Sequence, residues 1–136
     1  MSPAFLLDTN VISEPTKQKP NAGFMDRLER EGDRIAISSV TWHEAVYGMR
    51  LMPDGKRKRA VLAYLTALSV PILPFDVAAA EWLADERARL HKKGKPVPYA
   101  DAQIAAIAAV NGLTLVTANA KDFNRFEGLA VESWMR

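Results

Sequence analysis

The sequence predicts a three-layer α/β/α domain with a mostly parallel central sheet. Short apolar runs of strand length alternate along the 136 residues with longer segments that carry apolar residues at helical spacing. Strands that alternate with helices form crossover units, and these units build parallel sheets covered by helices on both faces. No internal repeat and no long linker interrupts the pattern. We therefore expect one domain over residues 1–136.

The first half of the chain contains two predicted strands and three predicted helices. Phe5-Leu6-Leu7 is a short apolar run, and Asp8-Thr9-Asn10 after it predicts a polar turn. Pro53-Asp54-Gly55 is a helix-breaking segment. The remaining predicted elements are a helix over 21–31, a strand over 34–37, a helix over 40–52 and a helix over 56–69.

The second half continues the alternation. Pro71 and Pro74 flank the apolar core of a predicted strand over 70–74, which favours an edge position for it. Asp76 is a typical N-cap, and Pro98 suits the first turn of a helix. The predicted elements are a helix over 77–93, a helix from 98 to 110 that Asn111-Gly112 ends, a strand over 113–117, a polar turn with a short helix over 118–124, and a strand over 129–132.

Composition excludes several classes of protein. With 49% apolar and 25% charged residues, the chain has the composition of a folded globular protein. Cysteine is absent, which excludes disulfides, thiol nucleophiles and zinc–thiolate sites. No apolar run approaches the roughly 18 residues that a membrane span needs, and the N-terminus does not resemble a signal peptide. We expect a cytoplasmic protein with no membrane partner.

Basic residues are concentrated in two short runs, although the formal net charge is only +2. Residues 56–59 and 91–95 together hold seven of the 18 Lys and Arg residues. The second run ends a predicted helix, where cations suit the helix dipole. The first run begins a predicted helix, where cations are unfavourable. A solvated helix end is the usual role of such a run, and the mismatch is a signal for phosphate contact at residues 56–59.

Four carboxylates fall at one edge of the predicted sheet, where ligands bind in parallel α/β folds. Asp8 and Asp122 follow strand ends, and Glu44 and Asp101 are expected in the first turns of helices. Each also has a structural alternative. Asp8 and Asp122 could cap turns, Glu44 could complete a capping box with Thr41, and Asp101 could interact with its helix dipole.

The expected convergence of the four acids at one edge indicates a metal-binding catalytic site. Carboxylates that lie close together repel one another and raise their own pKa values. A hard divalent cation removes this conflict, and an oxygen-only ligand set suits Mg²⁺ or Mn²⁺. Such an ion can polarise a phosphodiester and activate a bound water. Hydroxyls at Thr9 and Thr117 could orient the ligands or the scissile phosphate.

Four segments, in order, resemble the motifs of PIN-domain ribonucleases. Leu7 to Ile12 resembles the opening motif, and Ser38 to Glu44 with Gly48 resembles the second. Tyr99 to Ala105 resembles the third. Leu115 to Asn119, continued to Asp122-Phe123, resembles the last. Together the motifs cover nearly the whole chain, whose size is similar to that of the bacterial VapC and FitB toxins of toxin–antitoxin pairs.

The resemblance implies an activity, a cofactor and partners. It implies an endoribonuclease that hydrolyses RNA with Mg²⁺ or Mn²⁺, forms a homodimer and is neutralised by an antitoxin. Asp8, Glu44 and Asp101 carry over as the acids of the metal centre, with Asp8 and Asp101 as metal ligands. Asn119 departs from the family pattern, because many relatives have an acid there. Either Asp122 supplies the fourth carboxylate, or Asn119 contributes a neutral oxygen.

Two other functions fit less well. A phosphatase of the haloacid-dehalogenase type carries Asp-x-Asp after its first strand, whereas Asp8 is followed here by Thr9 and Asn10. A catalytically silent PIN-like module that binds RNA or a protein is the second alternative. A surface that binds polyanions gains nothing from clustered carboxylates, so the retained acids favour the nuclease.

Overall fold

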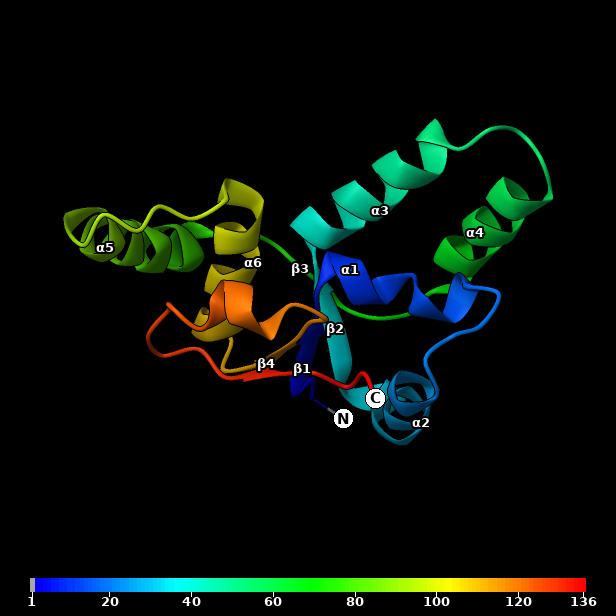
Figure 1. Ribbon diagram of the computed structural model, residues 1–136, viewed down its shortest axis with the longest axis horizontal. Coiled ribbons are helices and arrows are strands. Elements are labelled where there is room, and N and C mark those ends of the chain that lie inside the picture. Colours follow the sequence, from blue (N-terminus) through cyan, green and yellow to red (C-terminus); the bar gives the residue numbers. More distant parts are fainter. Residues whose placement is uncertain (1) are drawn as a thin grey trace.

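A five-stranded parallel sheet forms the centre of the molecule. The computed structural model describes residues 2–136, and its strands lie in the order β3-β2-β1-β4-β5 with all four pairings parallel (Figure 1). The strands are β1 (Phe5–Leu7), β2 (Ile35–Ser38), β3 (Ile72–Leu73), β4 (Thr114–Val116) and β5 (Val131–Glu132). The predicted parallel sheet is confirmed. The strand order reverses beside β1, which places the expected binding crevice at the carboxyl ends of β1 and β4.

Six α-helices and three short 3₁₀ helices connect the strands. They are α1 (Thr9–Ile12), η1 (Glu14–Thr16), α2 (Ala22–Glu31), η2 (Gly32–Arg34), α3 (Ser39–Leu51), α4 (Lys56–Ala67), α5 (Val77–Lys92), α6 (Tyr99–Val110) and η3 (Ala120–Phe123). Asp76 caps α5 as predicted, because its Oδ1 accepts from Ala79 N at 2.9 Å. Among the described residues, no helix is both long and apolar enough to cross a membrane.

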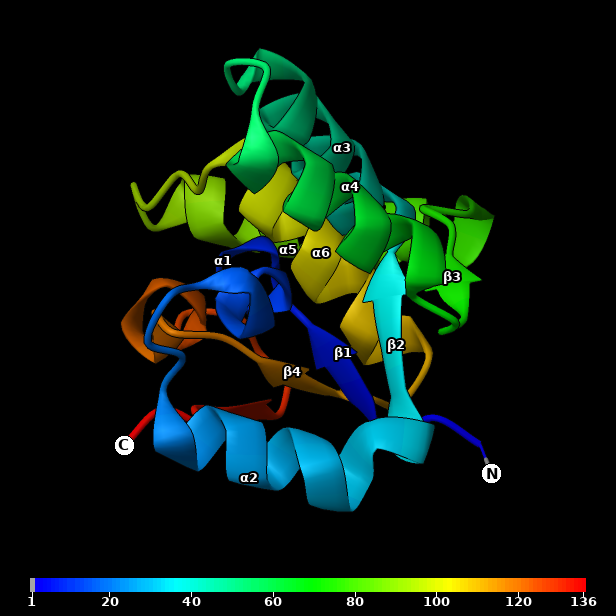
Figure 2. The same ribbon diagram turned by 90° about the vertical axis from the view of Figure 1, so that its right-hand side faces the viewer.

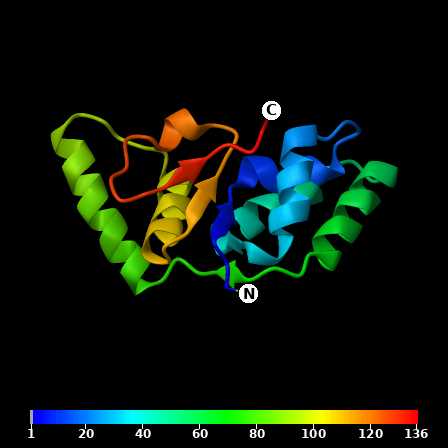
Figure 3. The ribbon, with the colours of Figure 1, turned by 90° about the horizontal axis from the view of Figure 1, so that it is seen from below.

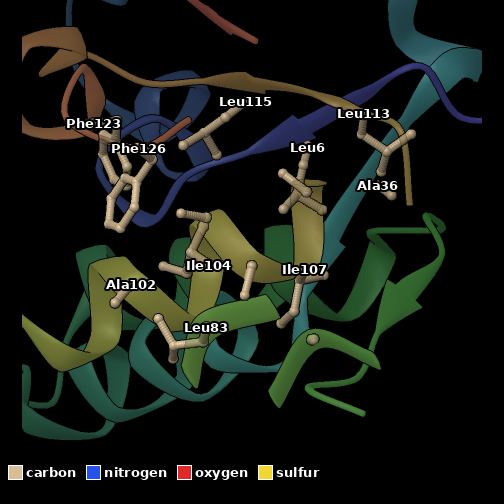
Figure 4. Close-up of a cluster of buried hydrophobic side chains, with 14 of the residues drawn as sticks. Leu6, Ala36, Leu83, Ala102, Ile104, Ile107, Leu113, Leu115, Phe123 and Phe126 are labelled. Carbon is tan, nitrogen blue, oxygen red and sulfur yellow. The ribbon is translucent and has the colours of Figure 1, made fainter. Parts of the chain in front are cut away.

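Two apolar clusters on opposite faces of the sheet give the three layers. Leu6 of β1 faces α5 and α6, whereas its neighbours Phe5 and Leu7 face α2, because side chains alternate along a strand. Figure 2 shows α2 below the sheet and α6 above it. Figure 4 shows Ile104 of α6 on the side of the helix that faces Leu115 of β4 and the sheet. The three-layer prediction is therefore confirmed.

Helices α3 and α4 form an arm that extends the molecule beyond the sheet. Their contact is built on Met49 from α3 and Val61 and Leu65 from α4, which form a separate buried cluster. Figure 3 shows that α4 and α5 lie at opposite ends of the molecule. Helix α1 packs against α3 of the arm beside the carboxyl edge of the sheet (Figure 1).

Some element boundaries differ from the predictions. The segment after Asp8, predicted as a polar turn, is the four-residue helix α1. Asp8 starts it by accepting from Thr9 N, and Val11 and Ile12 are buried. The predicted strands over 70–74 and 129–132 shorten to β3 and β5 of two residues each. Both lie at sheet edges, as the prolines predicted for β3.

Glu86 ties α5 to the loop that follows Asp122, a role that the sequence did not reveal. Its carboxylate, 8% exposed, accepts from Arg89 Nε at 2.8 Å and Nη2 at 2.9 Å, and from Glu127 N at 2.8 Å. Arg89 also donates to the Arg125 carbonyl at 2.8 Å. The hydrogen bonds from Arg89 are the largest cause holding the pKa of Glu86 below its ordinary value, against the opposing effect of burial.

Replacing Glu86 by alanine is expected to lower the free energy of unfolding at neutral pH by about 1–3 kcal/mol, because the Arg89 guanidinium and the Glu127 N–H lose the charged acceptor that they share. A lowered folded-state pKa stabilises the fold above the unfolded pKa, and this contribution is lost as the pH falls through the folded pKa. Denaturant titrations of both proteins should therefore show a deficit at pH 7 that shrinks in acid. Equal stability at pH 7 would show that the contact contributes nothing.

Candidate active site

Asp8 stands at the carboxyl end of the central strand and is held from two sides. Its Oδ1 accepts from Thr9 N at 2.8 Å, and its Oδ2 accepts from the Thr117 hydroxyl at 2.8 Å. Asp8 is 3% exposed, and Thr117, which follows β4, is fully buried. The neighbouring ends of β1 and β4 thus fix the orientation of this carboxylate at the switch in strand order. The predicted orienting role of Thr117 has a direct geometric basis.

Glu44 approaches the same edge from α3. Its Oε1 accepts from the Thr9 hydroxyl at 2.8 Å, and the buried Thr41 hydroxyl lies 3.2 Å from the same Thr9 oxygen. Thr9 therefore joins the start of α1 to α3 and sets the position of Glu44. Its main-chain N–H donates to Asp8 and its hydroxyl donates to Glu44, so Thr9 contacts two of the predicted site carboxylates.

The capping-box alternative for Glu44 is wrong. Helix α3 begins at Ser39, and Ser38 is its N-cap, whose Oγ accepts from Thr41 N at 2.9 Å. Thr41 is thus a residue of the first turn and not the cap. Glu44 lies a full turn too far along the helix to reach back to the cap residue. Glu44 therefore does not have the capping role that was the structural alternative to a catalytic one.

Asp101 enters from the first turn of α6, as predicted, and is partly buried. Helices α1, α3 and α6 approach one another at this edge (Figure 1). Burial is the largest cause raising the pKa of Asp101, followed by the negative charges of Asp122 and Glu44. Burial likewise raises the pKa of Asp8, against the hydrogen bonds from Thr117 and Thr9, and the charges of Asp101 and Glu44 add to it.

Asp101 therefore lies within electrostatic reach of each of the other three acids. Asp122 acts on Asp101 but is not among the charges that affect Asp8. It lies inside η3 and is exposed, and the cap position of η3 is held by Asn119. In the structure of residues 2–136, no three His, Asp or Glu side chains already converge on one point that could hold a metal ion.

Asn119 contributes through its main chain to the same network. Its N–H donates to the Thr117 hydroxyl at 3.1 Å, and its side chain is exposed. Asn10, which was not predicted as a site residue, joins the loops after β1 and β4. Its Oδ1 accepts from Ala118 N at 3.2 Å, and its amide donates to Thr117 at 3.3 Å. The only signal for Asn10 was its place in the motif after the first strand.

The arrangement suits one kind of ligand. Carboxylate and hydroxyl oxygens are the donors that Mg²⁺ and Mn²⁺ prefer. Within residues 2–136, none of the four acids forms an ion pair with a Lys or Arg side chain. The pKa values of Asp8 and Asp101 are raised first by burial and then by the neighbouring acids, and a bound cation would offset both effects. The residues present fit a divalent cation.

Comparison with known proteins identifies the family. A sequence model of the PIN domain matches residues 5–129, nearly the whole chain. This chain belongs to the PIN-domain family. A relative from Shigella flexneri, the tRNA(fMet)-specific endonuclease VapC, is 36% identical over 130 residues, which are 96% of this chain and 97% of the relative. Toxin FitB from Neisseria gonorrhoeae is 34% identical, with 95% of this PIN domain and 97% of FitB covered.

A solved structure agrees with this PIN-domain fold. The crystal structure of DNA-bound VapBC from Salmonella typhimurium superposes with a TM-score of 0.84 at 34% identity, covering 97% of this chain and 98% of that chain. The three-layer arrangement and the resemblance drawn from the four motifs are both confirmed. The relative from Shigella flexneri is named as an endonuclease, and the relative from Neisseria gonorrhoeae is named as a toxin.

Proposed function

We propose that this PIN domain is a Mg²⁺- or Mn²⁺-dependent endoribonuclease in which Asp8, Glu44, Asp101 and Asp122 form the catalytic centre. The observation that carries the proposal is the group of mutually repelling carboxylates at the carboxyl edge of β1 and β4, none of which is ion-paired with a Lys or Arg among residues 2–136. A site that attracted RNA by charge alone would be basic. An acidic centre makes sense for RNA only when a metal ion lies between the carboxylates and the phosphate.

Each residue of the centre has a part in this scheme. Asp8 and Asp101 would hold the metal ion directly, and Glu44 and Asp122 would complete its surroundings. The bound ion would polarise a phosphodiester oxygen and lower the pKa of the attacking water. Thr117 and Thr9 keep Asp8 and Glu44 in place through hydrogen bonds of 2.8 Å, so little side-chain freedom is lost when the ion binds.

The proposal is tested with purified protein and a single-stranded RNA whose two ends are blocked. Internal cuts are expected, because the open carboxyl edge does not require a free end. The Shigella relative is named for the initiator tRNA, so that tRNA is a suitable second substrate. RNA that binds and stays intact with Mg²⁺ and with Mn²⁺ would favour the catalytically silent module instead.

Replacing Glu44 by glutamine should separate charge from structure. Glutamine keeps the oxygen that accepts from Thr9, and Glu44 has no capping role, so the free energy of unfolding should change by less than about 1 kcal/mol. Cleavage should fall far more, because one negative charge of the metal centre is lost. Melting temperatures and cleavage rates are compared with Glu29→Gln, an exposed glutamate on α2. Lost stability with an unchanged cleavage rate would contradict the assigned role.

Asp122 carries a negative charge and Asn119 carries none, so alanine substitutions should show which of them fills the fourth position of the site. Asp122→Ala is expected to weaken metal affinity or turnover by roughly 10–100-fold, as for groups that act through other ligands, because its charge reaches Asp101. Asn119→Ala should have a smaller effect, since its recorded contact with Thr117 uses the main-chain N–H. The measurement is the cleavage rate as a function of Mn²⁺ concentration. The opposite ranking would transfer the fourth position to Asn119.

An antitoxin partner and a cytoplasmic site of action complete the proposal. The solved relatives include members of toxin–antitoxin systems, among them a toxin–antitoxin complex from Klebsiella pneumoniae, and FitB is itself named a toxin. We expect expression of this chain alone to slow bacterial growth, and a small protein encoded beside it to restore growth. Normal growth with abundant, active protein would remove the toxin assignment and leave the nuclease assignment standing.

A homodimer is also proposed. Large apolar side chains are exposed on the arm and the adjacent sheet edge, where Leu51 is 66%, Ile72 46% and Leu62 44% exposed. Leu62 and Ile72 also line a hollow of about 540 Å³ between α3, α4 and β3. Sedimentation equilibrium should report twice the 15.0 kDa chain mass, and a stable monomer would contradict the assignment.

A further inference from the structure

Two hollows lead away from the carboxylates between α1, η1 and the arm. The first, of about 250 Å³, is lined by Thr9 and Glu44 of the candidate site and also by Met52, Arg57 and Tyr64. The second, of about 710 Å³, is more open and is lined by the basic residues Lys17, Lys56 and Arg57. Together they extend from the candidate active site to the start of α4.

The second hollow is basic and is joined to the first. Lys17, Lys56 and Arg57 line it, and Thr16 and Arg57 belong to the lining of both hollows. Arg57 donates to the Thr16 carbonyl and, at 3.4 Å, to the Thr16 hydroxyl, which are neutral groups. Lys17 lies 2.8 Å from the Glu14 carboxylate. Among the residues that the structure describes, Lys56 and Arg57 form no ion pair with an acid.

Lys56 and Arg57 lie at the N-terminus of α4, where their positive charges destabilise the helix. The first turn of α4 contains no acid, and Gly55 offers no side chain to cap it. Positive charge at a helix N-terminus is unfavourable by typically about 0.3–1 kcal/mol per group. A bound anion between η1 and α4 would reverse the sign of this interaction. The charge of Lys56 and Arg57 is thus available to a ligand outside the chain.

We propose that the two hollows form a track for the RNA strand on one side of the scissile bond, with Lys56 and Arg57 binding its phosphates. The inner hollow, walled by Tyr64, Met52 and neighbouring apolar side chains, would take the nucleotide between those phosphates and the carboxylates. This rests on the proposed function and adds where the substrate lies. The metal centre would cleave the strand, and the track would supply affinity that the acidic centre cannot.

Binding is measured in the Asp8→Asn background, so that the RNA is not cut and the track is tested even if cleavage fails. The probe is a short, fluorescent single-stranded RNA titrated at several salt concentrations. Each phosphate contact on a single strand contributes about 0.7 to the slope of log affinity against log salt, so Lys56→Ala with Arg57→Ala should lower the slope by about 1.4. Affinity at physiological salt should fall by about tenfold.

The matched control removes the same charge from the same helix. Lys58→Ala with Arg59→Ala also deletes two cations of α4, and neither residue lines the hollows. This pair should leave the slope nearly unchanged. Arg57→Lys keeps the positive charge but not the paired hydrogen bonds to Thr16. This variant should keep most of the salt slope, which would show that the slope depends on the charge and not on a folding defect.

Two results would overturn the track. Equal slopes for the two double variants would show that the cations act only through net charge. A labelled acidic peptide provides the second arm. If Lys56→Ala with Arg57→Ala weakens binding of the peptide but leaves RNA binding unchanged, the hollows serve a polypeptide and not the substrate.

Discussion

Replacing Asp8 by asparagine is expected to abolish RNA cleavage while the fold survives. Asparagine retains one acceptor oxygen for Thr9 N, and its amide can donate to Thr117 with the hydroxyl reversed. The lost charge is one that burial and the neighbouring acids already disfavour, so the melting temperature should equal or exceed that of the wild type. Loss of a directly bound ligand removes several kcal/mol of transition-state stabilisation, which corresponds to about 10³-fold or more in rate.

A control exists for this substitution in another part of the fold. Asp76 is also an aspartate that starts a helix by accepting from main-chain N–H, and asparagine is an equally good cap. Asp76→Asn should leave both cleavage and melting temperature close to wild type. Cleavage rates and thermal melts of both variants are measured together. Full activity in Asp8→Asn would remove this residue from the catalytic centre.

The overall architecture was accessible from the sequence because burial dictates it. Strands such as Phe5-Leu6-Leu7 are covered on both faces, so each is a continuous apolar run that the pattern reveals. The parallel arrangement followed from the helices between the strands. The order of the strands did not follow, because pairing β1 with both β2 and β4 depends on contacts between distant segments.

Local boundaries were less predictable where polar residues have more than one use. Ser38, Ser39 and Thr41 can all cap a helix, and β2 passes directly into α3 without a loop. The sequence alone could not rank these caps, and the choice of Thr41 produced the incorrect capping box. Helix α1 was missed because four residues are too few to show a helical period, so Val11 and Ile12 gave no pattern.

The candidate site was predictable as a set of acids but not as a network. Positions at strand ends and in the first helical turn singled out Asp8 and Asp101, which the structure brings within electrostatic reach. The hydrogen bonds from Thr9 to Glu44 and from Thr117 to Asp8 depend on long-range packing. Thr117, for example, is 109 residues from Asp8 in the sequence. The same holds for Asn10, whose partners lie in the loop after β4.

Removal of the metal ion is expected to have an effect as large as that of Asp8→Asn. Without a cation, the clustered negative charges of Asp8, Glu44 and Asp101 repel the phosphate of the substrate, and no other group supplies an activated water. The fold should persist, because the contacts that hold Asp8 and Glu44 are made by Thr9 and Thr117 within the chain. Activity and structure should therefore respond differently to a chelator.

The most direct test of a metal-dependent carboxylate centre is the cleavage rate of wild-type protein on end-blocked RNA in excess EDTA, followed by addition of Mg²⁺ or Mn²⁺ beyond the chelator. We predict that cleavage falls to background in EDTA and returns when either ion is added, with an unchanged circular dichroism spectrum throughout. Cleavage that continues at the same rate in excess EDTA would contradict it.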